Sequence, residues 1–310
     1  MKTTADIIRA AWQQGLAVPA FNVPYLPMME PVIRAVCDQD SFALITVARL
    51  EWVKFEARGL APVRDEFQKW RDDQHVRLHL DHVPVIDEDH QRVDYMAIIR
   101  EAIALGYQSV MVDGSRLGLE ENIRATREIA DLAHASGIPC EGELGAVLGH
   151  EAGPLPPYEE LFRSGKGFTR PEEARRFVRE TDCDWLSVAI GNIHGAVSAA
   201  ARDHKKTEAH LNLEHLELLK QATGIPLVLH GGSDTPDQDI RRAIETGIDK
   251  INIWTDVRIP YLRSIKEKLD GPIEKIDVPE VFAAARKAAF DVIRQKNQLL
   301  GSTGKATQYA

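Results

Sequence analysis

Apolar residues occur along this chain in two alternating patterns. Short, almost unbroken apolar runs are typical of strands buried on both faces, and an apolar residue at every third or fourth position is typical of an amphipathic helix. Gly106, Gly137, Gly224 and Gly247 each follow a helical stretch, where glycine commonly ends a helix, and an apolar run begins soon afterwards. The predicted strands are Ala17–Asn22, Phe42–Val47, Val76–Asp81, Ser109–Asp113, Pro139–Leu144, Trp185–Ala189, Pro226–His230 and Lys250–Ile253.

Strands that each precede a helix predict a (β/α)8 barrel, an α/β fold, formed by residues 1–310 as a single domain. Residues 4–16 predict an N-terminal capping helix. The segment Val278–Leu300 predicts an extra C-terminal helix, so that this helix and the small polar tail occupy about residues 278–310. A doubly wound sheet is the alternative, but it usually has fewer strands for this length. It also often carries a glycine-rich fingerprint after its first strand, which this chain lacks.

Composition argues against two classes of partner. The net charge is −9 and no basic tract exceeds Lys205-Lys206, so we expect no nucleic-acid partner. No apolar run approaches the roughly 18 residues of a membrane span, so we expect no membrane partner. Cys37, Cys140 and Cys183 form no CxxC pair, and the N-terminus lacks the apolar centre of a signal peptide. We therefore expect a reduced, cytoplasmic location.

Polar residues follow almost every predicted strand at its C-terminal end. In a barrel of this class the active site lies at that end. These residues are Asn22, Arg49, Asp81, His82, Asp113, Ser115, Glu141, Glu143, Asn192, His194, His230, Ser233, Asn252 and Thr255. His82, His194 and His230 stand at the ends of three different strands and predict a metal site, because neutral imidazoles are common metal ligands.

Each of these residues also has a structural interpretation when it is taken alone. A strand-end histidine is more often hydrogen-bonded within the fold than bound to a metal, and Asp113 can simply cap the next helix. Glu141 and Glu143 share one strand face because side chains alternate along a strand. We expect both to point into the barrel, because the other face packs under helices. By the same alternation, Asp81 and His82 are expected on different strand faces.

Several motifs connect these positions in an unbroken order. They are Phe21-Asn22-Val23, His79-Leu80-Asp81-His82, Ser109-Val110-Met111-Val112-Asp113-Gly114-Ser115, Glu141-Gly142-Glu143-Leu144-Gly145, Gly191-Asn192-Ile193-His194-Gly195, Pro226 to Ser233, Lys250-Ile251-Asn252 and Gly301-Ser302-Thr303-Gly304-Lys305-Ala306. With this set the chain resembles the class II, zinc-dependent ketose-bisphosphate aldolases of the fructose- and tagatose-bisphosphate type. The resemblance extends from about residue 5 to residue 306.

The resemblance implies a metal centre. His82, His194 and His230 match the ligands of Zn2+ or another divalent metal, and Glu143 matches an alternative ligand. A monovalent cation is a further cofactor that the resemblance allows. In such enzymes the metal binds the ketone and hydroxyl oxygens of the donor and, as a Lewis acid, stabilises an enediolate.

The resemblance also assigns proton transfer and substrate binding. Asp81 matches the acid/base at the hydroxyl of the cleaved carbon, Glu151 the acid that moves the carbon-bound proton, and Asn252 the residue that positions the donor's oxygens. No Schiff-base lysine is needed, and no predicted strand ends in a lysine beside the site. The implied partners are a small-molecule sugar and further copies of the chain, in a homodimer or homotetramer. The residues expected to bind substrate are Asn22, Arg49, Gly195, Gly231, Ser233, Asp234, Thr255 and Arg286.

Departures from the family pattern lie mainly where the donor phosphate binds. Ser198 stands where the family has a phosphate-binding lysine, and Asp234 stands where it has a glycine. Trp254 replaces an Asp or Asn, Ala48 a substrate-facing serine, and Val83 the glycine after the first histidine. A lost lysine and an added carboxylate weaken phosphate binding. These changes predict a metal-dependent aldolase, a carbon–carbon lyase, whose ketose or keto-sugar has an unphosphorylated or otherwise atypical donor end.

Three alternatives stay open. In a conventional fructose- or tagatose-bisphosphate aldolase, basic residues of loop 196–210 such as Lys205 and Lys206 would replace the missing charge. A zinc-dependent sugar isomerase or epimerase would use the same enediolate chemistry without releasing an aldehyde. A non-catalytic companion subunit would not need the metal ligands that this chain has.

Arg286 matches an arginine that the family lends across a subunit interface, and it indicates an anionic far end of the substrate. It can also be a surface arginine.

Overall fold

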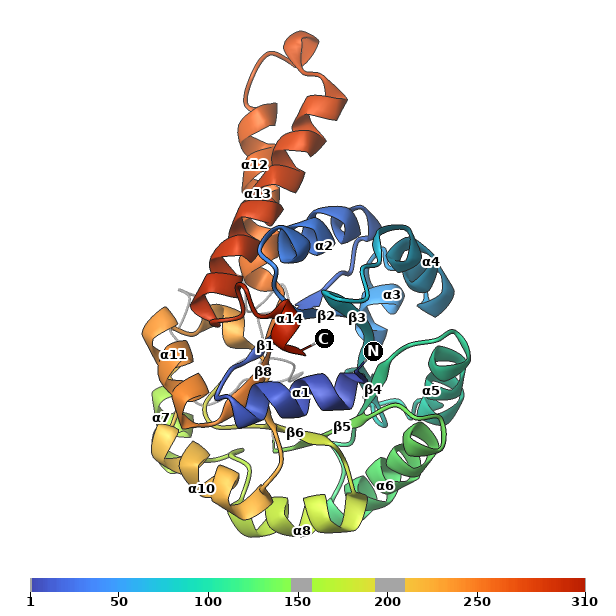
Figure 1. The fold of residues 1–310 in the computed structure, drawn as a ribbon, viewed down its shortest axis with the longest axis vertical. Coiled ribbons are helices and arrows are strands. Elements are labelled where there is room, and N and C mark those ends of the chain that lie inside the picture. Colours follow the sequence, from blue (N-terminus) through green and yellow to red (C-terminus); the bar gives the residue numbers. More distant parts are fainter. Residues whose placement is uncertain (1, 146–157, 193–209, 310) are drawn as a thin grey trace.

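Parallel strands close into a barrel in their order along the chain (Figure 1). The computed structural model describes residues 2–145, 158–192 and 210–309. The strands are β1 (Val18–Asn22), β2 (Ala43–Ala48), β3 (Val76–Pro84), β4 (Ser109–Asp113), β5 (Cys140–Leu144), β6 (Trp185–Val188), β7 (Leu227–Leu229) and β8 (Ile248–Ile253). The predicted (β/α)8 barrel is confirmed, and every predicted strand is present.

Helices surround the barrel on the outside (Figure 1). Those of the described residues are α1 (Thr4–Gln13), η1 (Leu26–Met28), α2 (Met29–Asp38), α3 (Arg49–Val53), α4 (Leu60–Trp70), α5 (Tyr95–Ala104), α6 (Leu119–Ala135), α7 (Tyr158–Ser164), α8 (Pro171–Thr181), α10 (Leu213–Thr223), η2 (Gly232–Asp234), α11 (Asp237–Thr246), α12 (Thr255–Leu269), η3 (Ile273–Lys275), α13 (Val278–Leu299) and α14 (Ala306–Tyr309). None of them is long and apolar enough to cross a membrane.

The helix α1 covers the N-terminal end of the barrel (Figure 1), as its amphipathic pattern predicts. Ile7 and Ile8 are buried in a cluster with Trp185 of β6 and Val228 of β7. These side chains close the barrel from below, which leaves its C-terminal mouth as the end where substrate can enter.

The strand β8 begins two residues earlier than the apolar pattern predicts. Asp249 and Lys250 interrupt that pattern, but both are buried with partners. The backbone N–H of Leu227 donates to Asp249 Oδ2 at 3.0 Å, and Lys250 Nζ lies 2.6 Å from Glu141 Oε2. Polar residues can therefore occupy a buried strand here because each has a specific partner, Asp249 on the neighbouring strand β7 and Lys250 across the barrel on β5.

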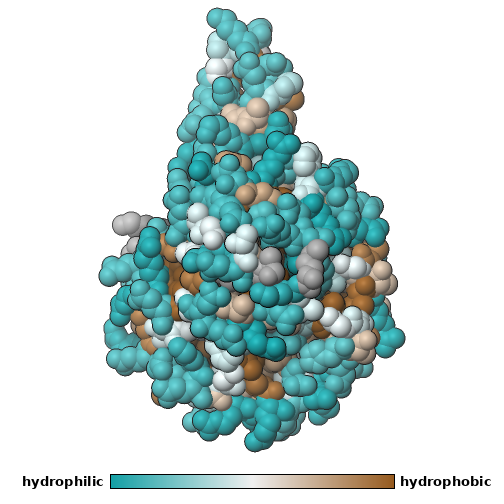
Figure 2. Space-filling model, in the orientation of Figure 1, coloured by the Kyte–Doolittle hydropathy of each residue, from teal (hydrophilic) through white to brown (hydrophobic). Residues whose placement is uncertain are grey.

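The helices α12 and α13 form a hairpin that extends well beyond the barrel (Figure 1). The predicted C-terminal helix is α13, which ends one residue earlier than expected. Apolar residues appear on this hairpin amid a mostly hydrophilic surface (Figure 2). The large apolar residues exposed on it are Ile259, Leu262, Leu269, Val278 and Phe282.

Candidate active site

A bulge in β3 aims two consecutive residues at the C-terminal mouth of the barrel. Asp81 and His82 lie opposite the single residue Met111 of β4, because the register between the strands shifts at this point. His82 has a φ of +35°, in the left-handed region that non-glycine residues seldom adopt. The bulge brings both side chains into one cluster with His230. The expectation that Asp81 and His82 lie on different strand faces is therefore wrong.

The carboxylate of Asp81 is buried between two side-chain amides. Asn22 Nδ2 donates to Asp81 Oδ2 at 2.9 Å, and Asn252 Nδ2 lies 3.1 and 3.0 Å from the two carboxylate oxygens. Burial opposes ionisation, but the charges of His82 and Lys250 outweigh it and hold the pKa of Asp81 below its usual range. Asp81 is thus an ionised carboxylate held in a fixed orientation.

The rings of His82 and His230 lie in contact beside Asp81, with their centroids 4.4 Å apart and their planes tilted by 59°. His82 Nδ1 lies 3.2 Å from Asp113 Oδ2, and the N-cap of α6 is Gly118, so the interpretation of Asp113 as a helix cap is wrong. His230 Nε2 lies 3.0 Å from Glu141 Oε1, and its Nδ1 lies 3.1 Å from Glu143 Oε2. Each imidazole is therefore oriented by a carboxylate. Glu141 and Glu143 both point into the barrel, as expected.

A buried ionic network lies directly beneath this cluster. Lys250 Nζ is 2.6 Å from Glu141 Oε2 and 3.4 Å from His79 Nε2, and Trp185 Nε1 donates to the same Glu141 oxygen at 2.5 Å. Burial, with the charge of Lys250, lowers the pKa of His79 to about 3, so this imidazole is neutral. The sequence did not predict a lysine beside the site, because only strand ends were considered and Lys250 lies within a strand.

Glu51, like Lys250, is a residue beside the site that the sequence did not predict. It lies in α3, directly after β2, and its Oε2 accepts from the backbone N–H of Ala48 at 2.8 Å. Burial raises the pKa of Glu51 to about 8, and the nearby charge of Asp81 adds to the effect. Arg49, predicted to bind substrate, has its Nη1 3.4 Å from Asp87 Oδ2. In the sequence, Glu51 has the appearance of an ordinary helix-surface carboxylate.

The turns after β7 and β8 are joined next to the cluster. Gly231 has a φ of +68° and leads into η2, which ends at Asp234. Ser233 Oγ accepts from the backbone N–H of Trp254 at 3.3 Å, and Thr255 then begins α12. In barrels of this class the turns after the seventh and eighth strands commonly bind phosphate. Here they place Ser233 and Thr255 in that position.

The family of the chain follows from a comparison with known protein families. Residues 2–305 match the family model described as fructose-bisphosphate aldolase class-II. The chain belongs to the class-II fructose-bisphosphate aldolase family. It is therefore an aldolase by family, and aldolases of this family generally depend on a metal.

Individual relatives cover most of the chain. The sulfofructosephosphate aldolase of Alkalicoccus urumqiensis is 30% identical over 98% of this chain and 97% of its own length. The uncharacterized protein YdjI of Escherichia coli (strain K12) is 41% identical over 72% of this chain and 73% of its own. The crystal structure of the YdjI aldolase from Escherichia coli K12 is similar with a TM-score of 0.76 at 31% identity. That similarity covers 99% of this chain and 100% of the other.

The side chains that offer metal ligands in the described part of the site fit the divalent metal that the aldolase family implies. His82, Asp113 and Glu143 each offer a ligand atom, all within 4.8 Å of one another. His230 engages a carboxylate through each ring nitrogen, which a neutral imidazole with one proton cannot satisfy by hydrogen bonds alone. Burial opposes a charge on His82, but Asp81 and Glu143 outweigh it and raise the pKa of His82 to about 10. The cluster therefore stabilises positive charge at the position where a cation would bind.

Some predicted site residues are not part of this description. His194, Glu151, Gly195 and Ser198 lie outside the described residues. Arg286 is on α13 of the protruding hairpin, where its charge acts on Tyr261 of α12. The structure thus assembles Asp81, Asn252 and His230 with their neighbours and places Arg286 on the hairpin.

Proposed function

We propose that this protein is a divalent-metal-dependent aldolase that reversibly cleaves a ketose or a related keto-sugar. The position of Asp81 is the main support. The amides of Asn22 and Asn252 hold its carboxylate beside His82 and His230, at the mouth of the barrel. A buried, ionised carboxylate next to metal-binding side chains is suited to accept a proton from a substrate hydroxyl.

Cleavage of a β-hydroxy ketone needs a base at the hydroxyl that becomes the aldehyde oxygen. Asp81 accepts this proton as the carbon–carbon bond breaks and its electron pair moves into the ketone fragment. Asn22 and Asn252 keep the carboxylate oriented by donating to it. In the direction of synthesis, Asp81 returns the proton to the same oxygen. Glu151, assigned from the sequence, would protonate the carbon that is left with the electron pair.

We propose Zn2+ as the metal, because imidazole and carboxylate ligands at an open site suit it. When bound, it supplies Lewis-acid stabilisation of the negative charge that develops on the donor's oxygens. His82, His230 and Glu143 would hold it, with His194 as the further ligand assigned from the sequence. Asp113 orients the imidazole of His82, as carboxylates behind metal-binding histidines commonly do.

We further propose that the donor end of the substrate is unphosphorylated or otherwise atypical. Ser233 and Thr255 offer neutral groups at the turns where a phosphate would bind. A phosphate dianion also needs positive charge, and the position expected to supply it is Ser198. Asp234 is an acidic residue at the end of η2, and Trp254 is an aromatic residue directly before α12. Both favour a neutral hydroxyl or carbonyl over a dianion.

The names of the relatives favour a second candidate. The family description names a bisphosphate, and one relative is named as a sulfofructosephosphate aldolase. A conventional aldolase acting on fructose or tagatose bisphosphate would need a cation near the turns after β7 and β8. Loop 196–210, with Lys205 and Lys206, is the segment that would supply it.

A substrate panel tests these proposals. The zinc-loaded protein is incubated with fructose and tagatose bisphosphates and with the corresponding unphosphorylated ketoses, and the released aldehyde and three-carbon ketone are quantified. We expect cleavage of an unphosphorylated ketose, lost in His230→Ala and after chelation. Efficient cleavage of a bisphosphate would contradict the donor proposal but support an aldolase. Interconversion of ketoses without a released aldehyde would indicate an isomerase or epimerase instead.

We also propose that the chain forms a homodimer or homotetramer through the α12–α13 hairpin. Leu262 is 51% exposed there, with other large apolar residues nearby, and a second copy would cover them. The same contact would carry Arg286 toward a neighbouring site. Leu262→Glu is expected to lower the mass measured by light scattering. Leu218→Glu, at a residue 53% exposed on α10, is the matched control and should leave the mass unchanged.

A further inference from the structure

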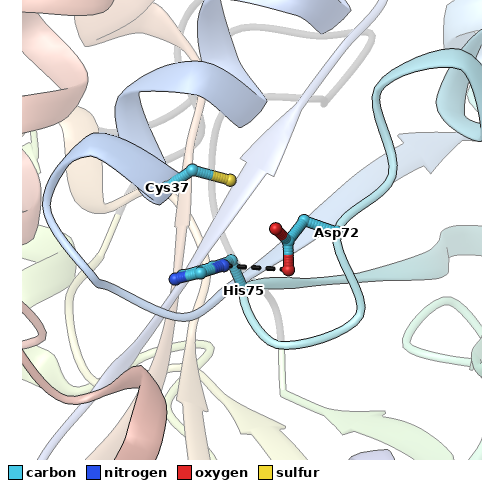
Figure 3. Close-up of side chains that lie close together, drawn as sticks. All are labelled: Cys37, Asp72 and His75. Atoms are coloured by element: carbon cyan, nitrogen blue, oxygen red, sulfur yellow. Dashed lines mark ion pairs between the residues drawn. The ribbon is translucent and has the colours of Figure 1, made fainter.

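A second cluster of ligand-type side chains lies at the opposite end of the barrel from the active site. Cys37 is near the end of α2, and Asp72 and His75 are in the turn between α4 and β3. Sγ of Cys37, a carboxylate oxygen of Asp72 and a ring nitrogen of His75 all lie within 4.8 Å of one another. In Figure 3 the thiol points toward the Asp72 carboxylate, and the His75 ring turns one nitrogen to the same carboxylate.

The hydrogen bonds of His75 leave one ring nitrogen in need of a cation. Nε2 lies 3.3 Å from Asp40 Oδ1, and Nδ1 lies 2.9 Å from Asp72 Oδ1. A neutral imidazole has a single proton, so if Nε2 donates to Asp40, Nδ1 presents a lone pair to a carboxylate oxygen. The buried Nδ1 also has no hydrogen bond of good geometry within the part of the chain that the structure describes. Two acceptors at this distance need a proton or a metal ion between them.

We propose that Cys37, Asp72 and His75 form a structural site for a divalent, zinc-type metal, separate from the catalytic centre. Thiolate, imidazole and carboxylate are all ligands that Zn2+ accepts. The contact of His75 Nε2 with Asp40 is the carboxylate–histidine arrangement found behind metal-binding imidazoles. The side chain of Asp72 is 45% exposed, so water can complete the coordination.

The backbone around the cluster is held firmly, which favours a preformed site. The N–H of Ala43 donates to the carbonyl of His75 at 2.9 Å, and the N–H of Val76 donates to that of Asp72 at 2.9 Å. Zn–N and Zn–S bonds of about 2.0 and 2.3 Å place tetrahedral ligands roughly 3.5 Å apart. The three candidate ligand atoms, all within 4.8 Å of one another, lie near this spacing.

Such a metal would join two turns that are distant in the sequence. Cys37 ends the helix before β2, and Asp72 and His75 precede β3. The carbonyl of Asp40 also accepts from the N–H of Ala306 at 2.9 Å, so the C-terminal tail packs against the same region. A ligand that binds only the folded state stabilises it by mass action. We therefore expect the metal to stabilise the N-terminal end of the barrel without entering catalysis.

Cobalt titration of the metal-free, full-length protein tests this proposal. A cysteine ligand gives a sulfur-to-cobalt charge-transfer absorption in the near ultraviolet, which the imidazoles and carboxylates of the active site cannot produce. We expect two Co2+ per chain and this absorption band. His230→Ala should lose one ion and keep the band, whereas Cys37→Ser should lose one ion and the band. Cys183→Ser, at a buried cysteine before β6, is the control and should keep both.

Several outcomes would overturn the proposal. A wild-type protein without the band, a band that persists in Cys37→Ser, or a single ion that His230→Ala removes would each do so. If Cys37→Ser does not fold, His75→Gln provides the same test. Loss of this ligand should weaken cobalt binding at the site that gives the absorption band by about tenfold or more. Turnover by zinc-loaded Cys37→Ser should equal that of the parent.

Discussion

Lys250 Nζ lies 2.6 Å from Glu141 Oε2 inside the barrel, and neither side chain is exposed to solvent. The other oxygen of Glu141 lies 3.0 Å from His230 Nε2. The ion pair therefore fixes the orientation of an imidazole that faces the catalytic mouth. Removal of one partner from such a pair leaves a buried charge without compensation.

Lys250→Met is accordingly expected to lower the free energy of unfolding by about 3–5 kcal/mol. The exposed pair Lys287–Asp291 is the matched control, because its N–O distance is also 2.6 Å but its side chains are 74% and 45% exposed. Lys287→Met should cost about 0–1 kcal/mol in urea unfolding at the same pH. Equal effects of the two substitutions would contradict a structural role for the buried pair. Lys250→Met with Glu141→Gln should recover part of the loss.

The barrel could be predicted from the sequence because its strands are buried on both faces. Apolar runs such as those of β2 and β7 follow directly from that burial, and glycines mark most of the intervening turns. Lys250 and Asp249 interrupt the apolar pattern of β8, and a buried polar residue can be predicted only when its partner is known. For Lys250 that partner is 109 residues away in the sequence.

Polar residues at the C-terminal ends of the predicted strands located most of the candidate site, but the sequence could not give the local geometry. Asp81 and His82 share a cluster because of a bulge, and the bulge depends on the pairing with β4. A regular strand pattern contains no signal for it. Glu51 was missed for a similar reason, because its burial depends on how the short helix α3 packs against β3. Its sequence neighbours, Arg49 and Lys54, are ordinary helix residues.

Asp81→Asn is expected to keep the metal and lose most turnover. The amide preserves the shape of the side chain and its burial, but it cannot accept the substrate proton. A general acid or base commonly contributes roughly 10²–10⁴-fold, so kcat should fall by that factor. The measurement is kcat alongside metal content by elemental analysis. Asp94→Asn, at the N-cap of α5, is the control, because Asn caps helices equally well. A loss of less than about threefold would mean that Asp81 is structural.

Stability should depend on pH through Asp249. Burial raises its pKa from 3.8 to about 7 in the folded chain. Between these values the folded state retains a proton that the unfolded state has lost, so this group makes the free energy of unfolding fall as pH rises. Asp249→Asn removes the effect and can still accept from the N–H of Leu227. The variant should gain stability relative to its parent from pH 4 to 7, by up to about 1.4 kcal/mol per unit of pKa shift. Parallel pH profiles of urea unfolding would show that Asp249 titrates normally.

The donor end of the substrate provides the last prediction. Asp234 ends η2, beside the turns that would bind a donor phosphate, and Ser198 stands where the family has a phosphate-binding lysine. Ser198→Lys with Asp234→Gly removes one negative charge and adds one positive charge, which together favour a dianion. We expect this double variant to raise kcat/KM for a phosphorylated ketose and to lower it for an unphosphorylated one. Lys69→Ser, in the last turn of α4, is a control that removes an exposed charge at the opposite end of the barrel from η2. A parent enzyme that already cleaves a bisphosphate with kcat/KM of about 10⁴ M⁻¹s⁻¹ or more would contradict the prediction.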